Sequence, residues 1–166
     1  MTELRISRWG NSAPMFKSIV RGGAAGAAGT TVLNAVTYAD MAVRGRPSSE
    51  APAQVVEKIS QDVGHPVPGS DDTRANRLSG LGALSGIAVG CATGSAVSLL
   101  RRVGIRLPWW LGGAVTGALA MAATDVPMAR LGVSDPTSWS FEDWVSDAVP
   151  HLMYGLVTYG IVAASD

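Results

Sequence analysis

The sequence predicts an all-α membrane protein in which four transmembrane helices form two hairpins, with short amphipathic helices in the outer loops. The chain has 166 residues and a mean hydropathy of +0.23, and only 16% of its residues are charged. An ordinary soluble domain carries about a quarter charged residues. The charges that remain are segregated, because four stretches of 18 to 23 residues contain no Asp, Glu, Lys or Arg: 22–39, 78–100, 107–124 and 148–165. Stretches of this length can cross the hydrocarbon core of a bilayer as helices.

The helices are expected in a single transmembrane domain, 19–164, that follows a cytoplasmic N-terminal tail, 1–18. Residues 1–21 carry four basic residues ahead of an apolar run, as a signal peptide does. The run is too long for the hydrophobic region of a signal peptide, so we expect it to be retained as the first helix. The four segments are predicted at about 19–43, 78–100, 108–128 and 145–164.

Two of the connections contain amphipathic patterns. After the first segment, Ser49 can cap a short helix with Pro52 in its first turn, and Gly64 supplies a stop. Before the last segment, Ser140 can cap a helix in which Phe141 and the apolar residues that follow share one face. Both stretches are acidic, and we expect them to lie on the outer surface of the membrane or to cover the bundle.

The basic residues predict the orientation. The short connection 101–107 carries three arginines and no acid, whereas the long and medium connections hold most of the acidic residues. Short basic loops stay on the cytoplasmic side. The sequence therefore predicts a multi-pass protein of the bacterial plasma membrane with both termini in the cytoplasm, Trp109 and Trp110 at the inner interface, and Trp139 and Trp144 at the outer one.

Glycines recur at every fourth position and predict helix packing. Small residues at this spacing expose backbone, and close van der Waals contact is what holds helices together in lipid. Such a groove could receive a helix of the same chain, a second protomer, a protein partner, or a flat lipid or quinone. The helix-packing candidates are Gly82, Gly86, Gly90, Gly94, Gly113 and Gly117, and Gly22 and Gly26 repeat the spacing in the first segment.

Polar groups gather at the predicted outer ends of the helices. Ionisable residues inside a membrane domain are costly and mark functional sites by default. A histidine beside carboxylates could exchange protons near neutral pH or help to hold a divalent metal. The alternative is that these residues simply reach water at the membrane boundary, with Asp147 and His151 forming an ordinary i, i+4 pair. The members of this polar cluster are Asp40, Asp125, Asp147, His151 and Tyr154.

No motif in the sequence assigns an activity. There is no nucleophile elbow, zinc-protease motif, P-loop or dinucleotide fingerprint. The net charge is zero, which gives no nucleic-acid footprint, and the lone Cys91 excludes a cysteine metal cluster. We therefore expect no catalytic residue, metal or cofactor, and a non-enzymatic scaffold or accessory subunit that contacts the bilayer and a second copy or another membrane protein. The alternative is a small transporter or proton pathway that uses the outer Asp and His residues.

The second half of the chain resembles a known bacterial family. The residues that carry the likeness are the run 128–136, the Phe141-Glu142-Asp143-Trp144 stretch and the Pro150-His151 start of the last segment. They are similar to the YagU-like inner-membrane proteins, and the many Ala and Gly residues suit an actinobacterial member. The resemblance implies a four-helix membrane fold and a link to acid or envelope stress, and it carries over Asp147 and His151. Pro150 stands where the family tends to have glycine.

Overall fold

The structure, a computed structural model, describes residues 12–165, and over that range it contains five α-helices, one short 3-10 helix and no strand. The elements are α1 (Ser12–Arg44), α2 (Ala51–Asp62), α3 (Asp71–Arg102), α4 (Trp109–Arg130), η1 (Pro136–Ser138) and α5 (Phe141–Ala164). The prediction of an all-α fold is confirmed.

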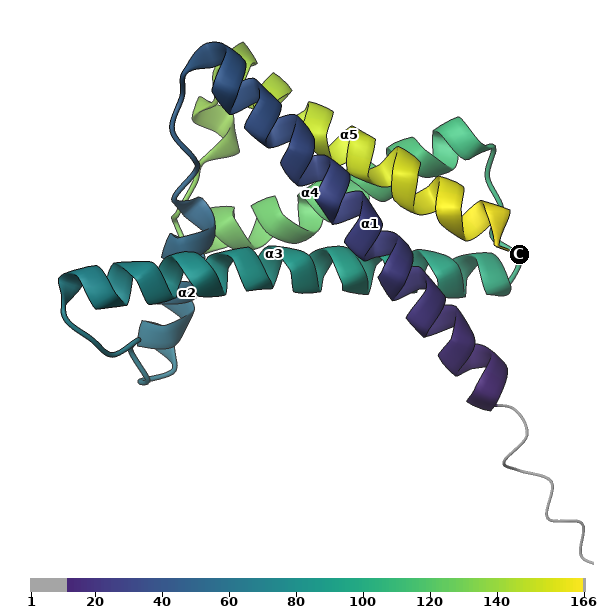
Figure 1. Ribbon diagram of the computed structural model, residues 1–166, viewed down its shortest axis with the longest axis horizontal. Coiled ribbons are helices and arrows are strands. Elements are labelled where there is room, and N and C mark those ends of the chain that lie inside the picture. Colours follow the sequence, from purple (N-terminus) through teal and green to yellow (C-terminus); the bar gives the residue numbers. More distant parts are fainter. Residues whose placement is uncertain (1–11, 166) are drawn as a thin grey trace, which may run out of the picture.

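The four long helices form one bundle (Figure 1). α1 packs along both α3 and α5, and α4 packs mainly against α5. The start of α1, the α3–α4 turn (103–108) and the end of α5 lie at one end, which we call the turn end. The connections 45–70 and 131–140 lie at the opposite end, which we call the loop end. All four long helices therefore run between the same two ends.

Local sequence signals set several helix limits. α2 and α4 are followed by Gly64 and Gly132, whose φ angles of 74° and 67° lie in the left-handed region that glycine tolerates best. α5 begins with a reciprocal capping box between Ser140 and Asp143. The predicted Gly64 stop and Ser140 cap are thus confirmed.

Several helices extend beyond the predicted transmembrane segments, because a helix continues through the charged residues that border an apolar run. α1 begins at Ser12, inside the predicted tail, and residues 1–11 of that tail lie outside the described residues. α3 begins at Asp71 rather than at 78. The second amphipathic helix is not a separate element, because it forms the first turns of α5, which runs on through Pro150. α2 begins at Ala51, and Ser49 Oγ accepts a bond from the Ala51 N–H without occupying the cap position.

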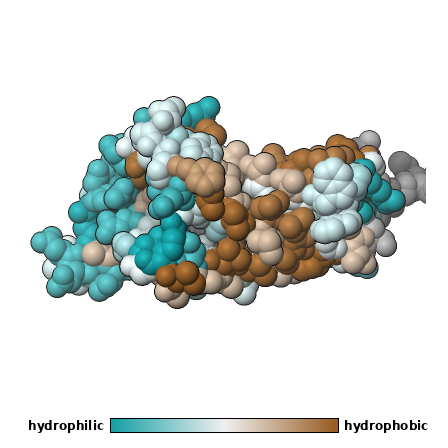
Figure 2. Space-filling model, turned by 90° about the horizontal axis from the view of Figure 1, so that it is seen from above, coloured by the Kyte–Doolittle hydropathy of each residue, from teal (hydrophilic) through white to brown (hydrophobic). Residues whose placement is uncertain are grey.

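The interior is built from small and polar residues, while large apolar side chains face outward. Phe16, Leu84 and Trp109 are 66%, 62% and 64% exposed. Figure 2 shows a broad hydrophobic surface over the middle of the molecule, with hydrophilic residues gathered at the loop end. Apart from glycines and Pro150, the buried residues are Ala25, Thr30, Leu78, Val97, Ser98, Arg101, Thr116, Ala120, Asp125, Tyr154, Thr158, Tyr159 and Val162. A water-soluble bundle has the reverse distribution.

Backbone contact at glycines joins α1 to α3. A Cβ on Gly94 would lie 2.8 Å from the Cα of Gly26, and a Cβ on Gly22 would lie 2.7 Å from the Cα of Ser95. Gly90 faces the Thr30 hydroxyl oxygen and the Gly26 backbone. Two helices can approach this closely only where at least one of them carries no side chain at the point of contact.

The remaining candidate glycines differ in their surroundings. Gly113 and Gly117 of α4 lie against the backbone of α5, where Gly155 supplies the matching gap. Gly82 lies against α2, with the Ala53 nitrogen 2.9 Å from the position of a Cβ. Gly86 faces open space. Apart from Gly86, the predicted packing glycines contact helices of the same chain.

Among the described residues, only α3 is long and apolar enough to cross a membrane by length and composition. The other long helices interrupt their apolar stretches with groups such as Asn34, Asp125 and Asp147, which lowers their hydropathy. The prediction of four spans therefore stays a prediction.

Candidate functional site

The candidate site lies near the loop end and is built on the first three turns of α5. Ser140 caps this helix, and its N–H and hydroxyl both donate to Asp143 Oδ2, at 2.9 and 2.7 Å. These bonds from Ser140 hold the pKa of the Asp143 carboxyl below its usual range. The cap fixes where α5 begins, and this determines which residues of the helix face α4.

Asp147 and His151 lie one turn apart on α5 and contact each other. His151 Nδ1 is 2.8 Å from the Asp147 carbonyl oxygen and 3.3 Å from Asp147 Oδ1. Because a carbonyl oxygen can only accept, Nδ1 carries the proton in this hydrogen bond. The side chains of His151 and Asp147 are 12% and 26% exposed. The two side chains are therefore mostly buried at the edge of the bundle.

Asp125 joins this pair from α4. The residue is only 9% exposed, and Thr124 Oγ1 lies 3.3 Å from its Oδ1. Its charged neighbours are Asp147 and His151. Asp147 Oδ2 is buried and has no hydrogen-bond partner among the described residues. The site thus holds two carboxyl groups and an imidazole, with one carboxyl oxygen that lacks a donor.

Close packing of α4 on α5 brings these three residues together. Gly117, two turns before Asp125, lies directly under the backbone of His151: a Cβ there would be 3.1 Å from the His151 carbonyl carbon. Pro127 and Pro150 stand inside α4 and α5 beside the site, and each removes one helix N–H. The glycine contact and the ionisable cluster are therefore parts of one interface.

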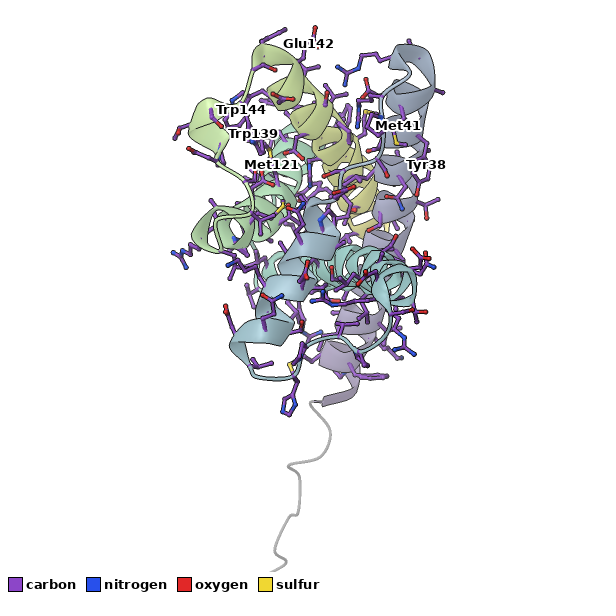
Figure 3. All side chains as sticks on the ribbon, turned by 90° about the vertical axis from the view of Figure 1, so that its left-hand side faces the viewer. Tyr38, Met41, Met121, Trp139, Glu142 and Trp144 are labelled. Carbon is purple, nitrogen blue, oxygen red and sulfur yellow. The ribbon has the colours of Figure 1, made fainter. Side chains whose placement is uncertain are left out.

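Asp40 does not join the cluster. Its carboxylate accepts bonds from Arg44 Nε and Nη2, both at 2.7 Å, and from Arg46 Nε at 2.6 Å. Arg44 also lies 3.6 Å from Glu142 and so links α1 to the start of α5. Figure 3, which looks onto the loop end, shows Tyr38 on the α1 side and Glu142 at the start of α5. The sequence placed Asp40 at the correct end of the bundle but in the wrong group.

Tyr154 lies deeper than the cluster and faces another helix. It is almost completely buried, and its hydroxyl donates to the Gly90 carbonyl oxygen of α3 at 2.7 Å. Thr158, one turn further along α5, donates to the Ala25 carbonyl oxygen of α1 at 3.4 Å. Tyr154 and Thr158 therefore join α5 to α3 and α1 rather than to Asp147 and His151.

The sequence reasoning missed a second polar site at the turn end. Arg101 Nη1 donates to the Tyr159 hydroxyl at 2.6 Å, and the guanidinium carbon lies 4.9 Å from the centre of the tyrosine ring. The same hydroxyl accepts from the Leu107 N–H and donates to the Leu107 carbonyl oxygen, both at 2.8 Å. Arg101 belongs to the arginines that predict the orientation, and no spacing in the sequence connects it to Tyr159.

The two tryptophans predicted at the outer interface lie together at the loop end. Their ring centroids are 5.0 Å apart in an edge-to-face arrangement, and Trp139 Nε1 donates to Ser134 Oγ at 3.0 Å. Figure 3 shows Trp139 and Trp144 on one side of α5, with Tyr38 and Met41 of α1 on the other.

The side chains of Asp125, Asp147 and His151 are of the types that bind and release protons. Within residues 12–165 no group of three or more His, Cys, Asp or Glu side chains is arranged to hold a metal ion. Two carboxyl groups and an imidazole in one partly dry site can exchange a proton among themselves and with water at the loop end. No family model, curated protein or solved structure matches the chain. The resemblance to YagU-like proteins therefore stays a prediction.

Proposed function

We propose that this chain is a small integral membrane protein whose four long helices cross the bilayer. The distribution of side chains supports this proposal, because large apolar residues lie on the outside and small or polar residues lie inside. An exposed apolar surface of this extent needs a non-aqueous neighbour. The tryptophans add support, since Trp109 and Trp110 are exposed near the turn end and Trp139 and Trp144 lie at the loop end.

The proposed orientation puts the turn end in the cytoplasm and the loop end outside. The arginines near the α3–α4 turn support it through the positive-inside rule. Cysteine labelling in intact cells tests it in a Cys91→Ala background. Ser70→Cys should react with a membrane-impermeant maleimide, whereas Val103→Cys at the turn end should react only after the membrane is permeabilised. The reverse pattern would overturn the orientation, and labelling of both positions in intact cells would argue against a membrane-spanning bundle.

Within this membrane protein, we propose that Asp125, Asp147 and His151 form a proton-binding site that responds to external acidity. The observation that carries the proposal is the buried Asp147 Oδ2 without a donor, next to a second carboxyl group. Two carboxylates offer only acceptors, so a proton shared between them supplies the missing hydrogen bond. Burial without such a partner would be costly in a site that is largely withdrawn from water.

The contacts below the cluster favour sensing over conduction. The hydroxyl groups of Tyr154 and Thr158 donate to backbone carbonyl oxygens and not to the cluster. A conducting path needs groups that pass a proton onward. We therefore expect the cluster to bind and release a proton at one face, and we expect no proton flux when the protein is placed in liposomes under a pH gradient. Flux that Asp147→Asn abolishes would favour the transporter alternative.

The chain has only two histidines, which makes the proton-binding proposal directly measurable. In protein labelled with carbon-13 histidine and placed in nanodiscs, His151 should give an imidazole signal whose titration shifts in Asp125→Asn and Asp147→Asn. His65 lies in the exposed loop before α3, so His65→Gln assigns the second signal and serves as the matched control. An unchanged His151 titration in both Asp variants would contradict the proposal.

A second candidate function is the scaffold or accessory subunit, and Gly86 is the observation that favours it. Gly86 and Gly80 of α3 face open space, while the other glycines predicted to mediate packing are occupied inside the chain. Crosslinking in membranes should then detect a complex that Gly86→Leu weakens. Gly160→Leu is the matched control, because Gly160 also faces open space but lies on α5. A monomer in wild-type membranes, or equal effects of both variants, would contradict association through α3.

A further inference from the structure

We propose that a groove beside the start of α3 binds one anionic phospholipid, with the lipid phosphate on Arg77 and an acyl chain along α3. This inference rests on the proposed membrane insertion but not on the proton-binding cluster. The groove has a volume of about 540 Å³. It is lined by His65, Val67, Pro68, Arg77, Gly80, Leu81 and Leu84.

The charge in the groove is a cation that lacks a carboxylate. Arg77 is exposed, and one of its nitrogens, Nη1, donates to the Pro68 carbonyl oxygen at 2.6 Å. That bond holds the guanidinium at the mouth of the groove and leaves its other N–H groups available. The neighbouring arginine differs, because Arg74 lies 2.6 Å from Glu57 Oε1 of α2. Within the described part of the chain, Arg77 forms no ion pair, so a phosphate can take that position.

The depth of the groove matches a phospholipid. Arg77 is the last charged residue before the uncharged stretch 78–100, which places it at the level of the headgroups. Leu84 follows it by seven residues, or about 10 Å along the helix axis, in the direction of the hydrocarbon core. A ligand that contacts both ends must therefore carry an anion at one end and a hydrocarbon chain at the other.

Gly80 provides the space for the chain. It lies between Arg77 and Leu84, and a Cβ added there would meet no atom within 4 Å. Leu81 and Leu84 expose 42% and 62% of their surface beside it. Apolar side chains next to an open glycine form a channel that one acyl chain fills, whereas a soluble phosphate would leave these leucines uncovered. Exposed apolar surface of this kind favours the lipid as the source of the phosphate.

Native mass spectrometry of the purified full-length protein, titrated with phosphatidylglycerol, tests the proposal. We expect one phosphatidylglycerol to bind in preference to phosphatidylcholine. Arg77→Gln should weaken that binding roughly tenfold, the order expected for one charge-assisted hydrogen bond. Gly80→Leu should weaken it as well, by filling the channel. Arg102→Gln and Gly86→Leu, at the far end of α3 and at its other open glycine, should bind like the wild type.

The possible outcomes distinguish a failure of the proposed lipid site from a failure of the proposed membrane insertion. Equal weakening by Arg77→Gln and Arg102→Gln, or normal binding by Gly80→Leu, would refute the lipid site. Full displacement of phosphatidylglycerol by millimolar inorganic phosphate would also refute it, because the chain would then contribute nothing. If alkaline carbonate releases the wild-type protein from membranes, membrane insertion itself fails. Retention in membranes combined with equal lipid binding by all variants would remove the lipid site alone.

Discussion

Gly155 offers the most direct test of how α4 and α5 are held together. A Cβ at this position would lie 2.7 Å from the Cα of Gly117 and closer still to the Gly113 carbonyl oxygen and the Gly117 nitrogen. All three neighbours are backbone atoms, so no side-chain rotation can make room. Carbon atoms in contact need about 3.5–4 Å. Gly155→Ala must therefore move the two helices apart by about 1 Å.

The expected magnitude follows from two opposing effects. Overpacking of a tight contact costs about 1–3 kcal/mol, and the upper value applies here because rigid backbone must shift. Replacing glycine by alanine inside a helix stabilises the helix by about 1 kcal/mol, because alanine has the higher helix propensity. Gly155→Ala should then lower the free energy of unfolding by about 2 kcal/mol. On the same helix, a Cβ added at Gly160 meets no atom within 4 Å. Gly160→Ala should therefore raise the free energy of unfolding, by up to about 1 kcal/mol.

Unfolding in mixed micelles by a denaturing detergent, followed by tryptophan fluorescence, measures this difference. The comparison of the two variants cancels the helix-propensity effect, and we expect them to differ by about 3 kcal/mol. If Gly155→Ala is as stable as Gly160→Ala, the backbone contact between α4 and α5 is not as close as described. The placement of Asp125 beside His151 would then lose its support as well.

Four further outcomes test other parts of the structure. Tyr159→Phe leaves the Leu107 backbone groups without their side-chain partner and should cost about 1–3 kcal/mol in the same unfolding assay, while Tyr38→Phe, at an exposed tyrosine, should have no effect. Ser140→Ala should cost roughly 1 kcal/mol through loss of the α5 cap. Because its pKa is lowered in the folded protein, Asp143 stabilises the fold above about pH 4 and loses this effect as the pH falls further, so Asp143→Asn should flatten the acid limb of a stability–pH profile. Gly82→Leu should displace α2 from α3 and raise hydrogen exchange in α2 while the bundle stays protected.

The sequence predicted the helices well because their signals are local. The charge-free runs locate the four long helices, and Ser140 and Gly64 mark ends through their immediate neighbours. The same signals could not define which face of each helix is buried. Gly86 and Gly90 have the same spacing in the repeat, yet Gly90 contacts α1 and Gly86 faces open space. Spacing identifies a stripe of small residues but not how far along it the neighbouring helix lies.

The candidate site was predictable to a similar extent. Asp147 and His151 are one turn apart, so the sequence alone suggests their contact. Asp40 and Asp125 are the same residue type at the same end of the bundle, but Asp40 finds its partners Arg44 and Arg46 within six residues of the chain. Asp125 instead meets residues of another helix, α5. The turn after α1 returns Arg46 to Asp40, and α4 packing brings Asp125 to Asp147. The pairing of Asp40 is therefore a local signal, whereas only the packing of α4 on α5 places Asp125 beside a second carboxyl group.

The position of His151 connects the proton-binding site to the packing of the bundle. Its imidazole contacts Asp147, and its own carbonyl group lies against Gly117 of α4. A change of charge on the side chain can therefore be accommodated by water at the loop end or by movement of α5, but not by a local adjustment at Gly117. Since Tyr154 and Thr158 tie the next turns of α5 to α3 and α1, such a movement would involve the helix as a unit. We therefore expect acidification to change hydrogen exchange along the α4–α5 interface in the wild type, and we expect His151→Gln to remove that dependence.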